Sequence, residues 1–216
     1  MDIRNYFKVI TKEQNETTEE ICTHVTKYQL GENSWIEQGI ISPDIHYNFN
    51  TLWNLHPKEY GQVRIAGKYV NTPRWQQSYC KPYWFSGMHH DALPLPDEFK
   101  PFLLWANTLF DDWAFNQVLI NHYSDGRHYI GAHTDNEQQI VPNSPIVSIS
   151  LGQTRLFRVR TKNTKEIVLD LEMLNKTYLA MCGRIQKEFT HEVPKVQGKK
   201  GSDMGKRINI TFRVFR

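Results

Sequence analysis

The sequence contains few cysteines and no long hydrophobic run. Cys22, Cys80 and Cys182 are the three cysteines among 216 residues. Their odd number and wide spacing argue against a disulfide framework and for a reducing compartment. No apolar segment approaches the ~20 residues that a membrane span requires, and residues 1–6 (MDIRNY) have no hydrophobic stretch of the signal-peptide type. We therefore expect an intracellular protein without a membrane segment.

The sequence also lacks a strong charge of one sign. Its formal net charge is +3 and its pI is about 8.7, which is compatible with a nucleic-acid partner but lies below the pI of ~9 that would indicate one. Several cations crowd the C-terminal end, and a solvated basic loop explains them as well as a binding surface does. Charge alone therefore leaves the partner open. The crowded cations are Lys195, Lys199, Lys200, Lys206, Arg207, Arg213 and Arg216.

No repeat or low-complexity tract interrupts the chain, whose length suits one domain with one substantial core. Apolar spacing predicts a helix within residues 11–30 and another from Asp97 to Phe110. Residues 73–96, rich in proline and aromatics, are expected to form loops and short strands. Short strands separated by turns then follow, which favours a β-sandwich or jelly roll with helices mainly in the N-terminal half. The expected strands are 115–123, 146–151, 156–160, 166–171, 177–181 and 207–215.

The motif His133-Thr134-Asp135 is the first candidate for a metal site. In a strand, residues two apart point to the same side, so this imidazole and carboxylate lie together. His191, which follows another apolar segment, is the preferred third ligand. Two histidines and one carboxylate form the ligand set of non-haem Fe(II) oxygenases, although a zinc hydrolase can use the same groups. The segment 89–91 (HHD) is a weaker metal candidate, because it lies in a Gly- and Pro-rich region.

Polar and apolar residues alternate strictly along 207–213, with Arg207, Asn209, Thr211 and Arg213 on one side. A half-buried strand with a solvent-exposed polar face explains this period. A receptor for a dicarboxylate co-substrate explains it equally, because guanidinium groups bind carboxylates bidentately. Two further residues could add neutral donors to the same ligand. These are Asn121 and Tyr123, with His122 pointing away from them.

Several motifs together resemble the AlkB family of Fe(II)/2-oxoglutarate dioxygenases, and most closely its nucleic-acid alkylation-repair branch. The resemblance extends from about residue 61 to the C-terminus, and we expect residues 1–60 to be an N-terminal extension that packs on the core. The motifs that carry it are residues 121–126 (NHYSDG), 130–137 (IGAHTDNE), 144–152 (SPIVSISLG), 155–157 (RLF), His191 and the 207–213 strand.

The resemblance implies a dioxygenase domain over residues 61–216, built as a double-stranded β-helix, which is a jelly roll. It implies that Fe(II) is bound by His133, Asp135 and His191. It also implies that 2-oxoglutarate lies among a set of polar side chains, with Arg207 on its distal carboxylate, and that dioxygen is the oxidant. The implied 2-oxoglutarate residues are Asn121, Tyr123, Arg207, Asn209, Thr211 and Arg213.

The resemblance further implies a nucleotide-recognition lid over about residues 61–96. Aromatic side chains of the lid would stack on an extruded base, and Glu137 would reach its exocyclic amine, although core packing also explains those aromatics. The implied activity is oxidative demethylation of N1-methyladenine and N3-methylcytosine in DNA or RNA. The implied substrate-binding residues are Arg74, Tyr83, Trp84, Phe85, Ser86, Asn136 and Glu137.

One position departs from the family. In the duplex-preferring branch a bulky aromatic in the hairpin before the lid fills the gap left by the extruded base, whereas this sequence has Ala66 there. A methyl group cannot separate stacked bases, so we expect a preference for single strands, or a different wedge residue such as Tyr69. The chain is expected to act as a monomer. Alternative functions are oxidation of a protein or small molecule, and nucleic-acid binding without catalysis.

Overall fold

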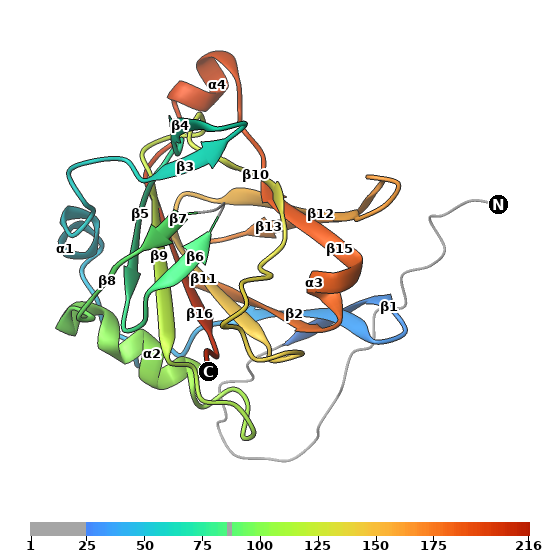
Figure 1. Ribbon diagram of the computed structural model, residues 1–216. Helices are drawn as coiled ribbons and strands as arrows, with labels where there is room; N and C mark the ends of the chain where they lie inside the picture. The colour runs from blue at the N-terminus through green and yellow to red at the C-terminus, as the bar shows by residue number, and fades with distance from the viewer. Residues whose placement is uncertain (1–24, 86–87) are drawn as a thin grey trace.

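Two facing β-sheets form the body of the protein, whose computed structural model describes residues 25–85 and 88–216. The large sheet has eight strands in the order β1-β2-β14-β11-β16-β9-β5-β8, and the small sheet has four in the order β10-β15-β12-β13. This arrangement confirms the predicted jelly roll (Figure 1). The large-sheet strands, in that order, are Thr26–Gly31, Ser34–Ile40, Thr177–Gly183, Ile146–Gly152, Arg207–Arg213, Gln117–Tyr123, Trp75–Tyr79 and Ala92–Leu93.

The remaining elements surround these sheets. The small-sheet strands are β10 (Ile130–His133), β15 (Phe189–Val193), β12 (Arg155–Thr161) and β13 (Ile167–Met173). Two hairpins pair β3 (Gln62–Ile65) with β4 (Lys68–Asn71) and β6 (Tyr83–Phe85) with β7 (Met88–His90). The helices are α1 (Phe49–Asn54), the 3-10 turn η2 (Asp97–Phe99), α2 (Lys100–Ala106), α3 (Ile185–Glu188) and α4 (Gly198–Ser202). Among the described residues no helix is long and apolar enough to cross a lipid bilayer.

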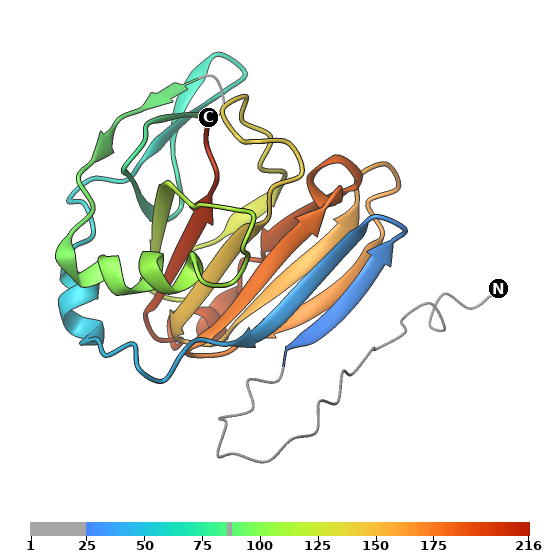
Figure 2. The ribbon, with the colours of Figure 1, turned by 90° about the horizontal axis from the view of Figure 1, so that it is seen from below.

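The central strands of the large sheet are buried on both faces. On its outer face, Ile208, Ile210 and Phe212 of β16 pack with residues of α1 and α2 in one hydrophobic cluster. Figure 2 shows these helices on the side of the large sheet away from the small sheet. A second cluster fills part of the space between the sheets and includes Phe157 and Val159 of β12. The inner face of β16 therefore points into the interior of the jelly roll and not to solvent.

One helix prediction is confirmed and the other is wrong where it can be compared. η2 and α2 occupy Asp97–Ala106 of the segment predicted to extend to Phe110, whereas residues 107–110 are not helical. The helix predicted within residues 11–30 falls mostly on residues 1–24, which lie outside the described residues. Residues 26–31 form strand β1, because β2 offers an antiparallel partner and because Tyr28 and Leu30 pack on the inner cluster. Pairing with a neighbouring strand outweighs a weak local helix propensity.

Candidate metal centre

Three side chains with metal-ligating groups converge between the two sheets. His133 ends β10 and pairs directly across the ladder with His191 of β15. Asp135 lies in the loop that follows β10, with Oδ1 at 3.9 Å from His133 Nε2 and Oδ2 at 3.8 Å from His191 Nε2. The three ligand atoms lie within 4.8 Å of one another. Within residues 25–85 and 88–216, this is the one group of three His, Cys, Asp or Glu side chains with such spacing.

The protonation of these groups suits a divalent metal ion. Burial lowers the pKa of His133, and burial together with His133 lowers the pKa of His191 to about 3, so both imidazoles are neutral near pH 7. Burial opposes ionisation of Asp135, but Arg213 and the two histidines outweigh it and hold the pKa of this carboxyl below its usual range. His133 Nδ1 lies 2.9 Å from Gly131 O. A proton on Nδ1 would therefore be bound by the backbone, which directs Nε2 to the metal.

Two further side chains hold Asp135 in place. Arg213 Nη2 donates to Asp135 Oδ1 at 2.8 Å, and both side chains are almost completely buried. The backbone N–H of Asp135 donates to Gln186 Oε1 of helix α3 at 2.9 Å. Gln186 was not identified from the sequence, because no local pattern connects it to a loop 51 residues away. These contacts position the carboxylate before any ion binds.

Replacing Gln186 by leucine is expected to weaken metal binding about tenfold, since the loop that carries Asp135 loses its anchor. The measurement is a Mn(II) titration followed by electron paramagnetic resonance. Gln153→Leu is the matched control, because Gln153 Oε1 accepts from the backbone N–H of Gly205 at 3.0 Å without contacting the site. Equal affinities in the two variants would contradict a role for Gln186 in positioning Asp135.

The polar side of β16 is buried, which rules out the solvent-exposed alternative for this strand. Its four polar residues are each at most 8% exposed. Arg207 Nε donates to Ser150 Oγ at 2.9 Å, and its guanidinium lies 5.0 Å from the ring centroid of Tyr123. Arg207 Nη1 is buried without a hydrogen-bond partner, and no carboxylate among the described residues pairs with this cation. Burial lowers the pKa of Arg207 to about 10. Such a site fits an incoming carboxylate, since a buried charge is unfavourable without a counter-ion.

The other predicted 2-oxoglutarate residues line one central pocket, and three of them already form hydrogen bonds to neighbouring side chains. Asn121 Oδ1 accepts from Arg74 Nε at 2.7 Å. Asn209 Nδ2 donates to Ser148 Oγ at 2.7 Å, and Arg213 Nη1 donates to Gln117 Oε1. Arg207 itself does not line this pocket, but it contacts Tyr123, which does. The pocket-lining members of the set are Asn121, Tyr123, Asn209, Thr211 and Arg213.

The predicted substrate residues divide between two depressions. Arg74, Tyr83 and Glu137 line the central pocket together with the metal triad. Trp84 and Asn136 line a second, more open depression. Ser86 lies outside the described residues, and Phe85 is described only as part of β6. Residues that line the central pocket and were not predicted are Leu119, Ile130, Ser148, Phe157, Met181, Glu192 and Val193.

Glu137 is the least satisfied polar group of the central pocket. Both carboxylate oxygens are out of contact with solvent and accept no hydrogen bond from another described residue. Burial raises the pKa of Glu137 to about 7, although Arg213 opposes the shift. In the same pocket, the ring of Tyr83 is almost fully buried and stacks on His90 at 4.8 Å between ring centroids. The pocket therefore offers an acceptor for a hydrogen-bond donor that the protein itself does not supply.

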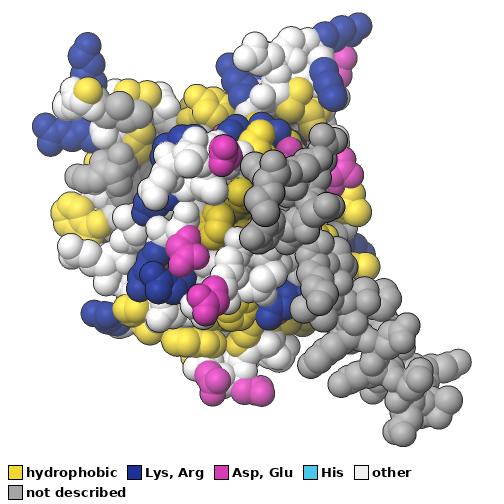
Figure 3. Space-filling view, turned by 90° about the vertical axis from the view of Figure 1, so that its right-hand side faces the viewer, with side chains coloured by type: hydrophobic (Ala, Val, Ile, Leu, Met, Phe, Trp, Pro, Cys, Tyr) yellow, Lys and Arg dark blue, Asp and Glu magenta, His cyan; other side chains and the backbone are white. Residues whose placement is uncertain are grey.

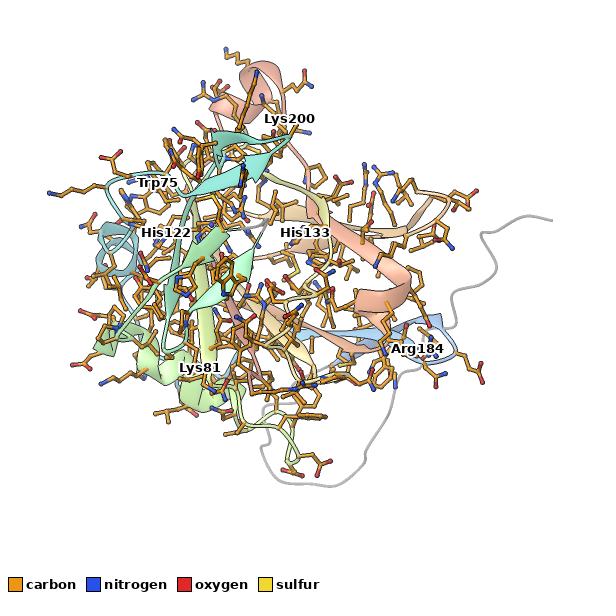
Figure 4. The ribbon with its side chains drawn as sticks, in the orientation of Figure 1. Trp75, Lys81, His122, His133, Arg184 and Lys200 are labelled. Carbon is orange, nitrogen blue, oxygen red and sulfur yellow. The ribbon has the colours of Figure 1, made fainter. Side chains whose placement is uncertain are left out.

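Two other histidine-containing segments lie apart from the metal triad. His122 points to the outer side of the large sheet, where Nε2 lies 3.3 Å from Leu52 O of helix α1. Figure 4 shows His122 and Trp75 toward α1, apart from His133. In the segment 89–91, His89 Nδ1 lies 3.2 Å from Asp91 Oδ1 on the surface, and the described residues provide no third ligand. The segment therefore does not form a metal site among the described residues.

Comparison with known proteins decides between the metal enzymes that could use this triad. The family model described as "2OG-Fe(II) oxygenase superfamily" matches residues 12–213. The chain belongs to this superfamily. Its class is therefore that of the Fe(II)/2-oxoglutarate-dependent dioxygenases, and its cofactors are Fe(II), 2-oxoglutarate and dioxygen. The match begins well before residue 61, so the family likeness includes part of the segment expected to be an extension.

Curated relatives of this oxygenase confirm its resemblance to the AlkB family. It is 31% identical over 168 residues to the human "DNA oxidative demethylase ALKBH2", covering 70% of this chain and 60% of that protein. It is 32% identical over 109 residues to the rat "Alpha-ketoglutarate-dependent dioxygenase alkB homolog 3", covering 47% of this chain and 36% of that protein. The chain thus spans less than two thirds of the length of each of these two relatives. A solved structure described as "The structure of OsALKBH1" shares the fold with a TM-score of 0.57 and 14% identity, covering 87% of this chain and 99% of that one.

Proposed function

We propose that the protein is an oxidative demethylase of nucleic acids. Its substrates are N-alkylated bases such as N1-methyladenine and N3-methylcytosine in DNA or RNA, and its products are the restored base, formaldehyde, succinate and carbon dioxide. The names of its relatives support a nucleic-acid substrate. We further propose that it acts as an intracellular monomer, with the triad binding Fe(II) and the polar side of β16 binding 2-oxoglutarate.

The observation that carries this proposal is the unpartnered carboxylate of Glu137 in the same pocket as the triad. N1-methyladenine and N3-methylcytosine are positively charged and carry an exocyclic amine. A buried carboxylate beside an aromatic ring suits both features, because it accepts from the amine and attracts the cation. A neutral or acidic substrate would leave this carboxylate buried and unpaired, which is unfavourable.

The residues of the site would perform three tasks. His133, Asp135 and His191 would hold the iron, and Arg207 would bind the distal carboxylate of 2-oxoglutarate. Fe(II), 2-oxoglutarate and dioxygen together supply the oxidising power that hydroxylates the N-methyl group. Tyr83 and Glu137 would orient the base so that its methyl group faces the triad. The protein thus contributes mainly by positioning the reacting groups and excluding water.

The test is a single-stranded oligonucleotide that contains N1-methyladenine, incubated with the protein, Fe(II), 2-oxoglutarate and ascorbate and analysed by mass spectrometry. Loss of the mass of one methyl modification, abolished in His133→Ala, is expected. Turnover of 2-oxoglutarate without methyl loss would indicate that the substrate is a protein or a small molecule instead. Tight oligonucleotide binding without succinate would instead indicate a binding module.

We infer that the surface around the small sheet contributes little to binding of the strand. On the described part of the face in Figure 3, Lys and Arg side chains are interspersed with Asp and Glu. Two of the ion pairs of the small sheet join Arg158 to Asp170 and Arg160 to Glu192, each at 2.8 Å. Surface cations that are already paired contribute little to phosphate binding.

The hairpin β3–β4 is expected to determine strand preference. Ala66 and Gly67 form its two-residue turn with φ values of 47° and 80°, and Ala66 presents only a methyl group at the tip. Ala66→Phe is expected to raise the ratio of duplex to single-strand demethylation several-fold, because an aromatic ring can fill the gap left by an extruded base. Phenylalanine at positive φ costs about 1–3 kcal/mol of local strain. The measurement compares initial rates on matched duplex and single-stranded oligonucleotides, and an unchanged ratio would contradict the prediction.

A further inference from the structure

A second depression lies beside the central pocket. It shares His133 and Glu137 with that pocket, and its remaining walls include Trp84, Asn136, Gln138 and Arg216. A group bound in the central pocket would therefore have the second depression next to it. If an alkylated base occupies the first, the covalently attached neighbouring nucleotide is close to the second.

Trp84 faces this depression and not the central pocket. Successive side chains of a strand point to opposite sides, so Trp84 points away from its neighbour Tyr83 in β6. Tyr83 is 2% exposed, whereas Trp84 is 56% exposed. The opposite residue in β7 is His89, whose ring meets the indole edge-to-face at 5.2 Å between centroids. A large indole surface held by a strand and left open to solvent is suited to stacking with a planar partner.

The opposite wall supplies a cation and amide groups. The backbone N–H of Arg216 donates to Gln139 O at 2.9 Å, which fixes the segment after β16 against the loop that carries Asp135. Lys81 Nζ donates to Phe215 O and Arg216 O at 3.2 and 3.1 Å. The Arg216 side chain is exposed and forms no ion pair with a described residue. Asn136 and Gln138 are exposed on the same loop, and each side-chain amide can donate or accept.

We propose that Trp84, Asn136, Gln138 and Arg216 form a second nucleotide subsite, which binds the nucleotide adjacent to the alkylated one. The inference rests on the proposed function. Trp84 stacks on the neighbouring base, which has lost its own stacking partner when the alkylated base enters the central pocket. Arg216 binds the phosphate of this nucleotide. Stacking and amide contacts tolerate any base, so the subsite adds affinity for a polynucleotide without strong sequence preference.

The test uses the full chain with Mn(II) and 2-oxoglutarate in the absence of dioxygen, so that substrate binds without turnover. The probe is a single-stranded oligonucleotide with N1-methyladenine flanked by 2-aminopurine, whose fluorescence is quenched by stacking. Wild-type protein is expected to quench the probe. Trp84→Ala is expected to abolish quenching and weaken binding about tenfold, in line with the loss of one base–aromatic stack. Trp84→Phe is expected to restore most of both, and Arg216→Gln to lower the slope of log affinity against log salt by about 0.7.

Leu104→Ala is the matched control, because Leu104 is 70% exposed on helix α2 and does not line either depression. Denaturation midpoints of all variants establish that each is folded. Unchanged quenching and affinity in Trp84→Ala, with normal binding by the wild type, would overturn the subsite alone. Absence of any binding of methylated oligonucleotides by the wild type would overturn both the subsite and the proposed function.

Discussion

Replacing Asp135 by alanine is expected to abolish metal binding and also to destabilise the metal-free protein by about 3–5 kcal/mol. The second effect arises because Arg213 is 3% exposed and its Nη2 has its charged partner in Asp135 at 2.8 Å. Arg213 Nε already lacks a hydrogen-bond partner, so Gln117 would be its main remaining contact. Removing the carboxylate would leave a buried cation without its hydrogen-bonded counter-ion, and Glu137 would be the remaining nearby carboxyl group. The measurements are a Mn(II) titration and urea unfolding of the metal-free protein.

His133→Ala is the control that separates the two effects. It removes a metal ligand as well, but the imidazole is neutral and partly exposed, so no buried charge is left behind. Metal binding is expected to be lost while the free energy of unfolding falls by only about 1 kcal/mol, as for an ordinary substitution. Equal losses of stability in the two variants would contradict the importance of the Arg213–Asp135 ion pair.

Replacing Arg207 by methionine is expected to weaken 2-oxoglutarate binding by a factor of about 10²–10³, which corresponds to the loss of a buried, charge-assisted contact. The stability of the protein without 2-oxoglutarate is expected to remain the same or to rise. The reason is that Arg207 is 1% exposed and has no carboxylate partner among the described residues. An apolar side chain of similar length relieves this unfavourable burial, at the cost of the hydrogen bond to Ser150. Binding is measured by calorimetry on the Mn(II)-loaded protein without dioxygen.

Arg158→Met provides the matched control for the loss of a guanidinium. Arg158 is partly exposed and pairs with Asp170, with Nε at 2.8 Å from Oδ1. This variant is expected to bind 2-oxoglutarate normally and to lose at most about 1 kcal/mol of stability. If Arg207→Met binds 2-oxoglutarate as the wild type does, another cation must bind the distal carboxylate. Arg155, whose guanidinium lies 5.7 Å from the ring centroid of Tyr123, would then be the next residue to replace.

The regular elements and the composition of the site could be predicted where the relevant pattern is local. Strict alternation places Arg207 and Arg213 on one side of β16, and the motif around His133 places an imidazole and a carboxylate together. Repeated Phe spacing located η2 and α2. The helix predicted within residues 11–30 was wrong for residues 26–30, because pairing with β2 is a contact that helix periodicity does not report.

By itself, the sequence determined the jelly-roll class and the face of β16 that carries the arginines, because these depend on the pattern of short strands and on side-chain periods of two. It predicted the pairing of His133 with Asp135 from a motif of three residues. Only the tertiary structure decided that this polar face is buried, that Gln186 anchors Asp135, and that Trp84 faces a different depression from Tyr83. Burial and hydrogen-bond partners are set by segments far apart in the chain, such as the 51 residues between Asp135 and Gln186. No local sequence pattern reports burial or hydrogen-bond partners of this kind, because these contacts form only when the two sheets pack together.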